Sequence, residues 1–509
     1  MVFVSLLVVG VMVRVLHLFL VDISLPYTAG GLFVQFADSI SNNSFLLPIN
    51  IPFYGFHGIP FGYPPLSFYL LALLIGPFNL PPIITINLLP PLLSFLTLPM
   101  IYALAGRLGF TRGARLAALA VFTLMPSSFI EFVESAGLAE VSGAIALLGF
   151  SISLIEEFNR QRWAVRILAG LLFACCVMAS PGSAYAAALM LTIYCGAQLL
   201  QQRRVSALIG PLVVGLVGFA LSAPYWLTVT LYHGGTLFLS SFSGQHGGGL
   251  LQAKSIALQP LWLHFRVSYA EAPFLWDGLI LGAFAWGIFT RKWLLPVTFL
   301  VLASIPREGR WLMAMPAALL AGQFLDGFLL PHVSQMLRSS YTLRWRKWLT
   351  AGIVSILFVY AHYNVVGATQ TVIPEYHNKL WTQRLDAMEW MSDNLPAEAA
   401  VIALSNEFVA EWVPYVVQRE TFNVVQGLEW LPERQAQASA LNTAMQRCSE
   451  LACIYASLNT GLGLAEYWLF IDTSVYDRLV LETGREATEF SFEEEWRNES
   501  IVVGRLAGP

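Results

Sequence analysis

The chain has 509 residues, of which 56% are hydrophobic and only 12% are charged, and its formal net charge is −4. Because soluble proteins carry about 25% charged residues, this composition and a mean hydropathy of +0.63 exclude an ordinary soluble globular protein. The net charge itself indicates little about partners, since the charged residues are segregated along the chain, and we expect no nucleic-acid partner.

Long apolar runs fill the chain up to about residue 369. Backbone polar groups cannot stay unpaired in hydrocarbon, so runs of about 20 apolar residues must form membrane-spanning helices. The first run is followed by no small-residue cleavage site, so we interpret it as a membrane helix and not as a cleaved signal. The predicted spans lie at about 2–21, 83–106, 114–130, 139–157, 164–180, 183–200, 206–224, 275–290, 293–306, 311–329 and 348–366.

Arginine and lysine residues set the predicted orientation of these spans. With about eleven spans and a cytoplasmic N-terminus, all five basic clusters fall in cytoplasmic loops. The predicted fold class is therefore a polytopic α-helical membrane protein with its N-terminus inside and its C-terminus outside. The clusters are Arg107/Arg112/Arg115, Arg160/Arg162, Arg203/Arg204, Arg291/Lys292 and Arg338/Arg344/Arg346/Lys347.

Two long loops are predicted on the outer face, at about 22–82 and 225–274. Within the first loop, the stretch 64–78 is apolar but short for a crossing and opens with two prolines, so we interpret it as an interfacial helix. The helical spacing of apolar residues predicts a second interfacial helix at about 29–42.

A polar, mixed-charge tail covers residues 370–509, after a predicted membrane domain at 1–369. Short β-like runs such as Ala400-Val401-Ile402-Ala403-Leu404 alternate with helical stretches such as 380–395, which predicts an extracytoplasmic α/β domain. Cys448 and Cys453 lie in this tail. A local disulfide between them would suit an oxidising compartment, and two unrelated thiols are the alternative.

Three glutamates, Glu131, Glu134 and Glu140, cluster between two predicted spans at the outer face. Carboxylates at the mouth of a membrane bundle are candidates for a general base or a cation ligand. Ordinary surface acids of a solvated loop are the alternative. Glu134 is the candidate base among them, because the residues that follow it are nonpolar.

Arg307, Glu308 and Arg310 form a charged turn between two predicted spans. Paired guanidinium groups bind phosphate or pyrophosphate through multiple hydrogen bonds, and arginines on the outer face run against the positive-inside bias. We therefore predict that the two arginines bind phosphate, and we count Glu308 with them among the candidate substrate-binding residues. A structural salt bridge to Glu308 is the alternative.

The second long outer loop is rich in glycine and carries His246 and Lys254. Glycines let backbone amides approach an anion closely, or let a lid move, and a loop without function is the alternative. We count both residues as candidate substrate-binding residues.

Three short motifs at the outer ends of helices carry a resemblance to a known family. They are Tyr63-Pro64-Pro65-Leu66, Ala179-Ser180-Pro181-Gly182 and Ser222-Ala223-Pro224-Tyr225-Trp226. Together with the long first outer loop and its two helices, they make residues 1–366 resemble the GT-C superfamily of membrane glycosyltransferases, which includes protein mannosyltransferases and the aminoarabinose transferase of lipid A. The resemblance implies a sugar donor on a polyprenyl-phosphate carrier, and we count Tyr63 among the candidate substrate-binding residues.

The resemblance also implies a catalytic base in the first outer loop, usually an Asp at the start of the first interfacial helix. Here the stretch 26–32 reads Pro-Tyr-Thr-Ala-Gly-Gly-Leu and has no acid. The nearest carboxylates are Asp22, at the membrane boundary, and Asp38, about two helical turns into the helix. Either one of these acids has taken the role, or Glu134 supplies the base, or the protein has lost transfer activity.

Two hypotheses follow. The first is a glycosyltransferase of the plasma membrane that moves a sugar from a polyprenyl-phosphate carrier to a glycan, lipid or protein acceptor on the extracytoplasmic face. The second is a catalytically degenerate relative that binds the lipid carrier or serves as a scaffold in an envelope complex. An ion-coupled transporter ranks below both, because most charges lie at the outer ends of spans. Beyond the lipid-linked donor no cofactor is indicated, and a divalent metal requirement stays open.

Overall fold

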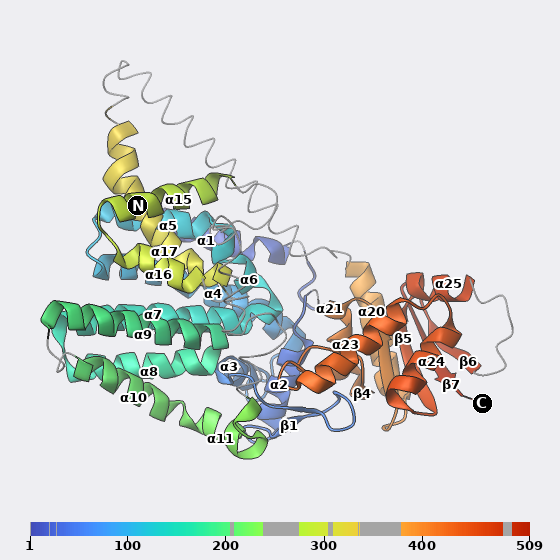
Figure 1. The fold of residues 1–509 in the computed structure, drawn as a ribbon. Coiled ribbons are helices and arrows are strands. Elements are labelled where there is room, and N and C mark those ends of the chain that lie inside the picture. Colours follow the sequence, from blue (N-terminus) through green and yellow to red (C-terminus); the bar gives the residue numbers. More distant parts are fainter. Residues whose placement is uncertain are drawn as a thin grey trace.

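The computed structural model describes residues 2–19, 21–26, 28–203, 208–237, 274–303, 309–333, 335, 378–481 and 491–508. A helical body and a C-terminal domain built on a β-sheet lie at opposite ends of the molecule (Figure 1). Two helices of the predicted first outer loop, α2 (Gly31–Asn42) and α3 (Leu66–Ile75), lie between them.

The helices of the body follow the predicted spans. Among the residues that the structure describes, four stretches are long and apolar enough to cross a membrane: Pro82–Arg107, Ser135–Arg160, Pro181–Leu200 and Trp311–Val333. A fifth span is present if α10 (Ile209–Leu221) and α11 (Ala223–His233), which meet at an angle of 54° around Ser222, count as one. The long helices of the body are α1 (Val2–Val15), α4 (Pro82–Arg107), α5 (Arg112–Leu124), α7 (Leu138–Arg160), α8 (Trp163–Ala179), α9 (Pro181–Gln202), α10 (Ile209–Leu221), α11 (Ala223–His233), α15 (Phe274–Phe289), α16 (Leu294–Ala303) and α17 (Gly309–Phe324).

Short helical turns complete the body, and they are η1 (Leu16–Phe19), η2 (Pro126–Ser128), α6 (Ile130–Val133), η3 (Ser135–Gly137) and the π-helical turn η6 (Leu325–Leu329). The count of eleven spans and the orientation in the membrane stay predictions. The span predicted at 348–366 lies outside the described residues.

Large apolar side chains are exposed along the outside of several body helices. Leu212, Leu216 and Phe219 on α10 are each more than half exposed, and Leu92 and Leu96 on α4 are at least half exposed. They recur every three or four residues, and a water-soluble protein rarely exposes such contiguous apolar surface. These faces support the prediction that the body lies in lipid.

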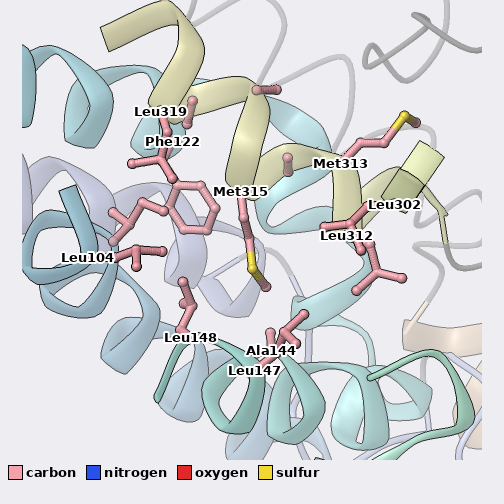
Figure 2. Packing of buried hydrophobic residues seen from close by; sticks show 14 of the residues in the cluster. Leu104, Phe122, Ala144, Leu147, Leu148, Leu302, Leu312, Met313, Met315 and Leu319 are labelled. Carbon is pink, nitrogen blue, oxygen red and sulfur yellow. The ribbon is translucent and has the colours of Figure 1, made fainter. Parts of the chain in front are cut away.

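The core of the body forms around α17. Phe122 of α5, Leu147 of α7 and Met315 of α17 are all buried in one cluster. Figure 2 shows this packing, in which side chains from α4, α5, α7, α16 and α17 meet. Every residue of α17 from Trp311 to Leu320 is buried, so this helix is enclosed by the others.

Ion pairs tie together the helix ends at one side of the body. Glu156 pairs with both Arg107 and Arg160, which belong to two different predicted cytoplasmic clusters. Glu157 is buried and accepts a hydrogen bond from Arg166 Nε at 2.8 Å. The structure therefore brings these two basic clusters to the same side, as expected if both loops face the cytoplasm.

The first outer loop contains both helices that the sequence predicts, α2 and α3. Pro64 and Pro65 precede α3 directly, where the missing N–H of proline costs no helical hydrogen bond. Between α2 and α3 the strands β1 (Asn50–Ile51) and β2 (Ile59–Pro60) pair antiparallel. Helix α2 is covered by protein on two sides, by α3 and by α22 (Val413–Val417) of the C-terminal domain, so even Gln35 is buried.

The C-terminal domain is built on a five-stranded sheet of order β4-β3-β5-β7-β6. Strand β3 pairs parallel with β4 and β5, whereas β7 pairs antiparallel with β5 and β6. The elements are α20 (Asn378–Asn394), β3 (Ala400–Leu404), α21 (Glu407–Ala410), α22, β4 (Glu420–Thr421), α23 (Pro432–Gln446), α24 (Leu451–Leu462), β5 (Glu466–Asp472), α25 (Thr473–Leu481), β6 (Ser491–Arg497) and β7 (Ile501–Ala507).

The two faces of this sheet belong to different cores, because successive strand residues point to opposite sides. Ala400 and Ile402 of β3 pack with α23, α24 and α25 in a core internal to the domain. Val401 and Ala403 belong to a second core that also contains α20 and, from the first outer loop, α2 and α3. The loop and the C-terminal domain therefore share one continuous hydrophobic core.

A disulfide joins Cys448 and Cys453 between α23 and α24, with their Cα atoms 5.4 Å apart. This confirms the local pairing considered from the sequence over two unrelated thiols. The bond closes the connection between the two helices that cover the internal face of the sheet.

The shared core generates a prediction about Phe36, a fully buried residue of α2 that contacts the rings of Phe61 and Phe68. A buried Phe→Ala change costs roughly 3–5 kcal/mol. Because the cavity would lie in the shared core, we expect Phe36→Ala to raise hydrogen–deuterium exchange in β3 of the C-terminal domain. Phe78→Ala, at a side chain that is 64% exposed, is the control. Loosening of α2 with unchanged exchange in β3 would contradict a shared core.

Candidate functional site

The C-terminal domain contacts the first outer loop at the start of α2. Glu411 Oε1 accepts hydrogen bonds from the backbone N–H groups of Gly30, at 3.1 Å, and Leu32, at 3.4 Å. No side chain of the loop itself caps this helix. Free N–H groups and the helix dipole favour an acceptor or a negative charge at a helix N-terminus. A residue 381 positions away therefore supplies the cap.

Glycines make this contact possible. A Cβ atom on Gly31 would lie 2.5 Å from the backbone oxygen of Glu411 and 2.8 Å from Cα of Trp412. A Cβ atom on Gly30 would lie 2.9 Å from Cβ of Ser135 and 3.3 Å from the Trp412 ring. Any larger residue, an acid included, would push the C-terminal domain away from the start of α2.

A buried hydrogen-bond network connects the same point to the helical body. Thr28 Oγ1 donates to Ser135 Oγ at 3.0 Å and accepts from Ser135 N–H at 3.1 Å. Ser135 Oγ in turn donates to Asn87 Oδ1 of α4 at 2.6 Å. Asn87 Nδ2 donates back to the backbone oxygens of Ile23 and Leu25. The loop, α4 and the segment before α7 are thus fixed to one another.

Glu134 directly precedes this network in the chain, and its side chain is half-buried. Burial raises the pKa of its carboxyl from 4.5 to about 8, and the charge of Glu131 adds to the rise. A carboxyl with a pKa near neutrality suits proton transfer better than one that is always ionised. Glu134 stays a predicted base, and its raised pKa is compatible with that role.

The other two predicted bases have different surroundings. Asp22 is exposed and accepts hydrogen bonds from the N–H and hydroxyl of Ser24, which lower its pKa. It is near the network, because Asn87 binds the next residue, Ile23. Asp38 is half-buried farther along α2, where burial raises its pKa and a hydrogen bond from Asn42 partly offsets this. The network therefore binds the chain directly after Asp22 and directly after Glu134, whereas Asp38 lies farther along α2.

Tyr63 takes part in a second contact between the loop and the C-terminal domain. Its hydroxyl donates to Glu429 Oε2 at 2.6 Å, and its ring meets Trp430 edge-on at 5.4 Å between centroids. Tyr225 of α11 donates to the backbone oxygen of Gly62 at 2.7 Å beside it. Tyr63 thus links the two parts of the molecule in this structure.

A third contact holds the β1–β2 hairpin to the C-terminal domain. Arg434 Nη1 and Nη2 donate to the backbone oxygens of Gly58 and Tyr54, both at 2.6 Å. A cavity of about 740 Å³ opens beside it, between the tip of the hairpin and helices α23 and α24. None of the predicted site residues that the structure describes lines this cavity.

The remaining predicted residues fall outside the described part of the chain. Arg307, Glu308, His246 and Lys254 are not described, and Arg310 is described only as backbone in the first turn of α17. Their roles stay predictions.

Sequence reasoning missed Glu411. Its neighbour Trp412 is fully buried. Burial raises the pKa of Glu411 to about 8; its two backbone hydrogen bonds oppose the rise, whereas the charges of Glu429 and Glu407 add to it. No local pattern around Glu411 indicates a contact with residue 30, so the sequence held no signal for it.

No family model matches the sequence, and no curated protein matches it. Solved structures match its fold. The AglB oligosaccharyltransferase of Archaeoglobus fulgidus, in complex with an inhibitory peptide and a dolichol-phosphate, matches over 93% of this chain and 70% of that one, with a TM-score of 0.59 and 13% identity. ArnT from Cupriavidus metallidurans, bound to undecaprenyl phosphate, matches over 99% of this chain and 97% of that one, with a TM-score of 0.52 and 12% identity.

These structural neighbours are GT-C glycosyltransferases. The chain has the GT-C fold. The arabinofuranosyltransferase AftD from Mycobacteria, another GT-C structure, matches over 99% of this chain but only 40% of its own, with a TM-score of 0.55 and 14% identity. At such low identities the likeness concerns the fold, and the resemblance inferred from the motifs is confirmed at that level.

One GT-C neighbour, the A. fulgidus enzyme, has also been solved in complex with Zn and sulfate. In the part of this chain that the structure describes, no three His, Cys, Asp or Glu side chains are grouped in a way that would hold a metal ion.

The buried carboxyl of Glu411 generates a prediction about pH. Its pKa of about 8 in the folded protein exceeds the ordinary 4.5, so the folded chain keeps a proton that the unfolded chain loses between these values. The free energy of unfolding should therefore fall as pH rises from about 4.5 to about 8. Glu411→Gln keeps an acceptor oxygen but cannot titrate, so it should make this fall shallower in thermal unfolding of the detergent-solubilised protein.

Two variants serve as comparisons for this measurement. Glu433→Gln, at an exposed residue of α23, should leave the pH dependence as in the wild type. Glu134→Gln should remove a further part of the fall, because burial raises the pKa of that carboxyl as well. An unchanged slope in Glu411→Gln would show that Glu411 does not hold its proton in the folded state.

Proposed function

We propose that this protein transfers a sugar from a polyprenyl-phosphate carrier to an acceptor on the extracytoplasmic face of the cytoplasmic membrane. The fold supports this, since the matched ArnT structure holds undecaprenyl phosphate and the matched AglB structure holds dolichol-phosphate. The acceptor is a glycan, a lipid or a protein.

The observation that carries the proposal is the position of Glu134. A half-buried carboxyl with a pKa of about 8 adjoins the network that binds the start of the first-loop helix α2. In the reaction, Glu134 would take the proton of the acceptor hydroxyl as its oxygen bonds to the anomeric carbon. The bond from that carbon to the carrier phosphate would break in the same displacement, and the phosphate would leave with the electron pair. Asp22 and Asp38 remain the alternative bases.

The leaving phosphate needs positive charge, and the proposal assigns this to Arg307 and Arg310. Guanidinium groups stabilise charge that develops on phosphate oxygens. Glu308 would orient the two arginines, and Tyr63, His246 and Lys254 would complete the binding site for the lipid-linked sugar. For these residues the proposal rests on the sequence.

The disulfide supports the proposed topology, in which residues 1–369 are the membrane domain and 370–509 the extracytoplasmic domain. Cys448 and Cys453 are paired, and such bonds persist in oxidising compartments. An extracytoplasmic C-terminal domain beside the first outer loop would place Glu134 at the extracytoplasmic surface of the cytoplasmic membrane.

A second candidate function is a catalytically degenerate protein that binds the lipid carrier or serves as a scaffold. One observation favours it: the start of α2 has no acid of its own and is covered by Glu411 and Trp412. In this case the protein would hold a polyprenyl phosphate without turning it over.

Native mass spectrometry of the purified protein separates these two functions. We expect a co-purified polyprenyl-phosphate sugar that disappears when acceptor-containing membranes are added. A bound carrier that never turns over would favour the degenerate binder. Absence of any such lipid, even after undecaprenyl phosphate is added back, would remove support for both.

In the transferase case, Glu134→Gln should lower turnover by about 10²–10⁴-fold, the usual contribution of a positioned base. Donor binding should persist, since the amide has nearly the same shape. Asp22→Asn and Asp38→Asn are the matched variants, and their turnover should stay within a few-fold of the wild type. A large loss in either of them, with Glu134→Gln active, would transfer the role of base to that aspartate.

A further inference from the structure

The backbone at Glu134 is held from both sides. The carbonyl oxygen of Glu134 accepts from Gly137 N–H at 3.0 Å, within the first turn before α7. The next N–H, that of Ser135, donates to Thr28 Oγ1 at 3.1 Å. The position of the Glu134 side chain therefore depends on where Thr28 lies.

Thr28 is held in turn by the C-terminal domain. Trp412 Nε1 donates to the backbone oxygen of Thr28 at 2.8 Å, and Trp412 is fully buried. Glu411 Oε1 accepts a hydrogen bond from the N–H of Gly30, two residues after Thr28. Thr28 itself is 5% exposed and Ser135 is completely buried, so water does not compete for these hydrogen bonds.

These contacts form a continuous path from the C-terminal domain to the proposed base. It runs from Trp412 to Thr28, from Thr28 to Ser135, and along the chain to Glu134. The glycine at position 30 lets Trp412 and Ser135 approach each other on either side of the loop.

We propose that Glu411 and Trp412 are positioning residues of the transfer site, which hold Glu134 in place through Thr28 and Ser135. The inference rests on the proposed function in that Glu134 is taken as the base. If so, the transfer site is complete only when the C-terminal domain is docked on the first outer loop. The domain then acts on the reaction without contributing a group that touches the substrate.

The first test measures position without activity, by hydrogen–deuterium exchange of the full-length protein in detergent. Thr28→Val removes the hydroxyl that accepts from Ser135 N–H, and exchange at Ser135 should rise roughly tenfold with the loss of that bond. Thr85→Val is the matched control, because the Thr85 hydroxyl donates to the backbone oxygen of Pro81, the residue before α4, and not to the network. It should leave exchange at Ser135 unchanged.

The second comparison asks whether the effect reaches Glu134 from the C-terminal domain. Trp412→Phe removes the donor to Thr28, and it should also raise exchange at Ser135. Trp390→Phe is the matched control, because it makes the same change in the same domain at a ring that stacks on Trp496. It should leave exchange at Ser135 unchanged. Glu411→Ala should raise the exchange, whereas Glu411→Gln, which keeps an acceptor oxygen, should restore it to the wild-type level.

The third readout is turnover of the co-purified lipid-linked sugar. Misplacement of a reacting group by about 1 Å costs up to about 100-fold in rate. We expect Thr28→Val and Trp412→Phe to lower kcat while KM for the donor stays the same, and to shift the limb of the pH–rate profile that reports Glu134. A purely structural role would lower kcat and the folded fraction together and leave the pH profile in place.

Unchanged exchange at Ser135 in Trp412→Phe and Glu411→Ala would overturn the inference, whether or not the protein is a transferase. Raised exchange without any turnover in the wild type would instead leave the positioning path in place and remove the proposed function. Raised exchange with full kcat and an unshifted pH profile in the variants would show that the path does not serve the reaction.

Discussion

The core shared by the first outer loop and the C-terminal domain is the constraint on which the rest of the site depends. One face of the sheet, with Val401 and Ala403, packs in a core that contains α20 of the same domain together with α2 and α3 of the loop. Helix α2 in turn has protein on two sides. Each part therefore buries some of its apolar surface against the other, which fixes the loop relative to the C-terminal domain. The proposed base, Glu134, lies on a segment that is hydrogen-bonded to this loop.

The start of α2 shows how two features of the chain compensate each other. The GT-C resemblance implies an acid at this point, and the chain has Gly30 and Gly31 instead. Those glycines admit the backbone of Glu411 and Trp412, and the carboxyl of Glu411 reaches the N–H groups that an acid of the helix would otherwise approach. Negative or acceptor character at the helix N-terminus is therefore kept, although its source has moved to the other end of the chain.

Much of this architecture could be predicted because it is local. The prolines before Leu66 and the apolar spacing from Leu32 to Ile40 predicted α3 and α2, the run Ala400–Leu404 predicted a strand, and the short spacing of two cysteines admitted a disulfide. Glu134 was recognisable because a carboxylate in a nonpolar flank is unusual. The contact of Glu411 with Gly30 could not be predicted, since it joins residues 381 positions apart and neither segment has a periodicity that requires the other. The contact of Tyr63 with Glu429 could not be predicted for the same reason, since these residues lie 366 positions apart.

The shared core has a consequence for biosynthesis. The ribosome completes α2 and α3 long before it reaches the strands of the C-terminal domain. The apolar side chains of these two helices therefore lack that domain as a partner while the later helices are synthesised. Contacts between residues so far apart close late and slowly, because a long loop must be ordered before they form. The last step of maturation is then the closure of the chain on itself at one surface, where Phe36 and Trp412 are first hidden together. Nascent chains that stop short of this step would present an apolar loop that quality-control proteases and chaperones recognise.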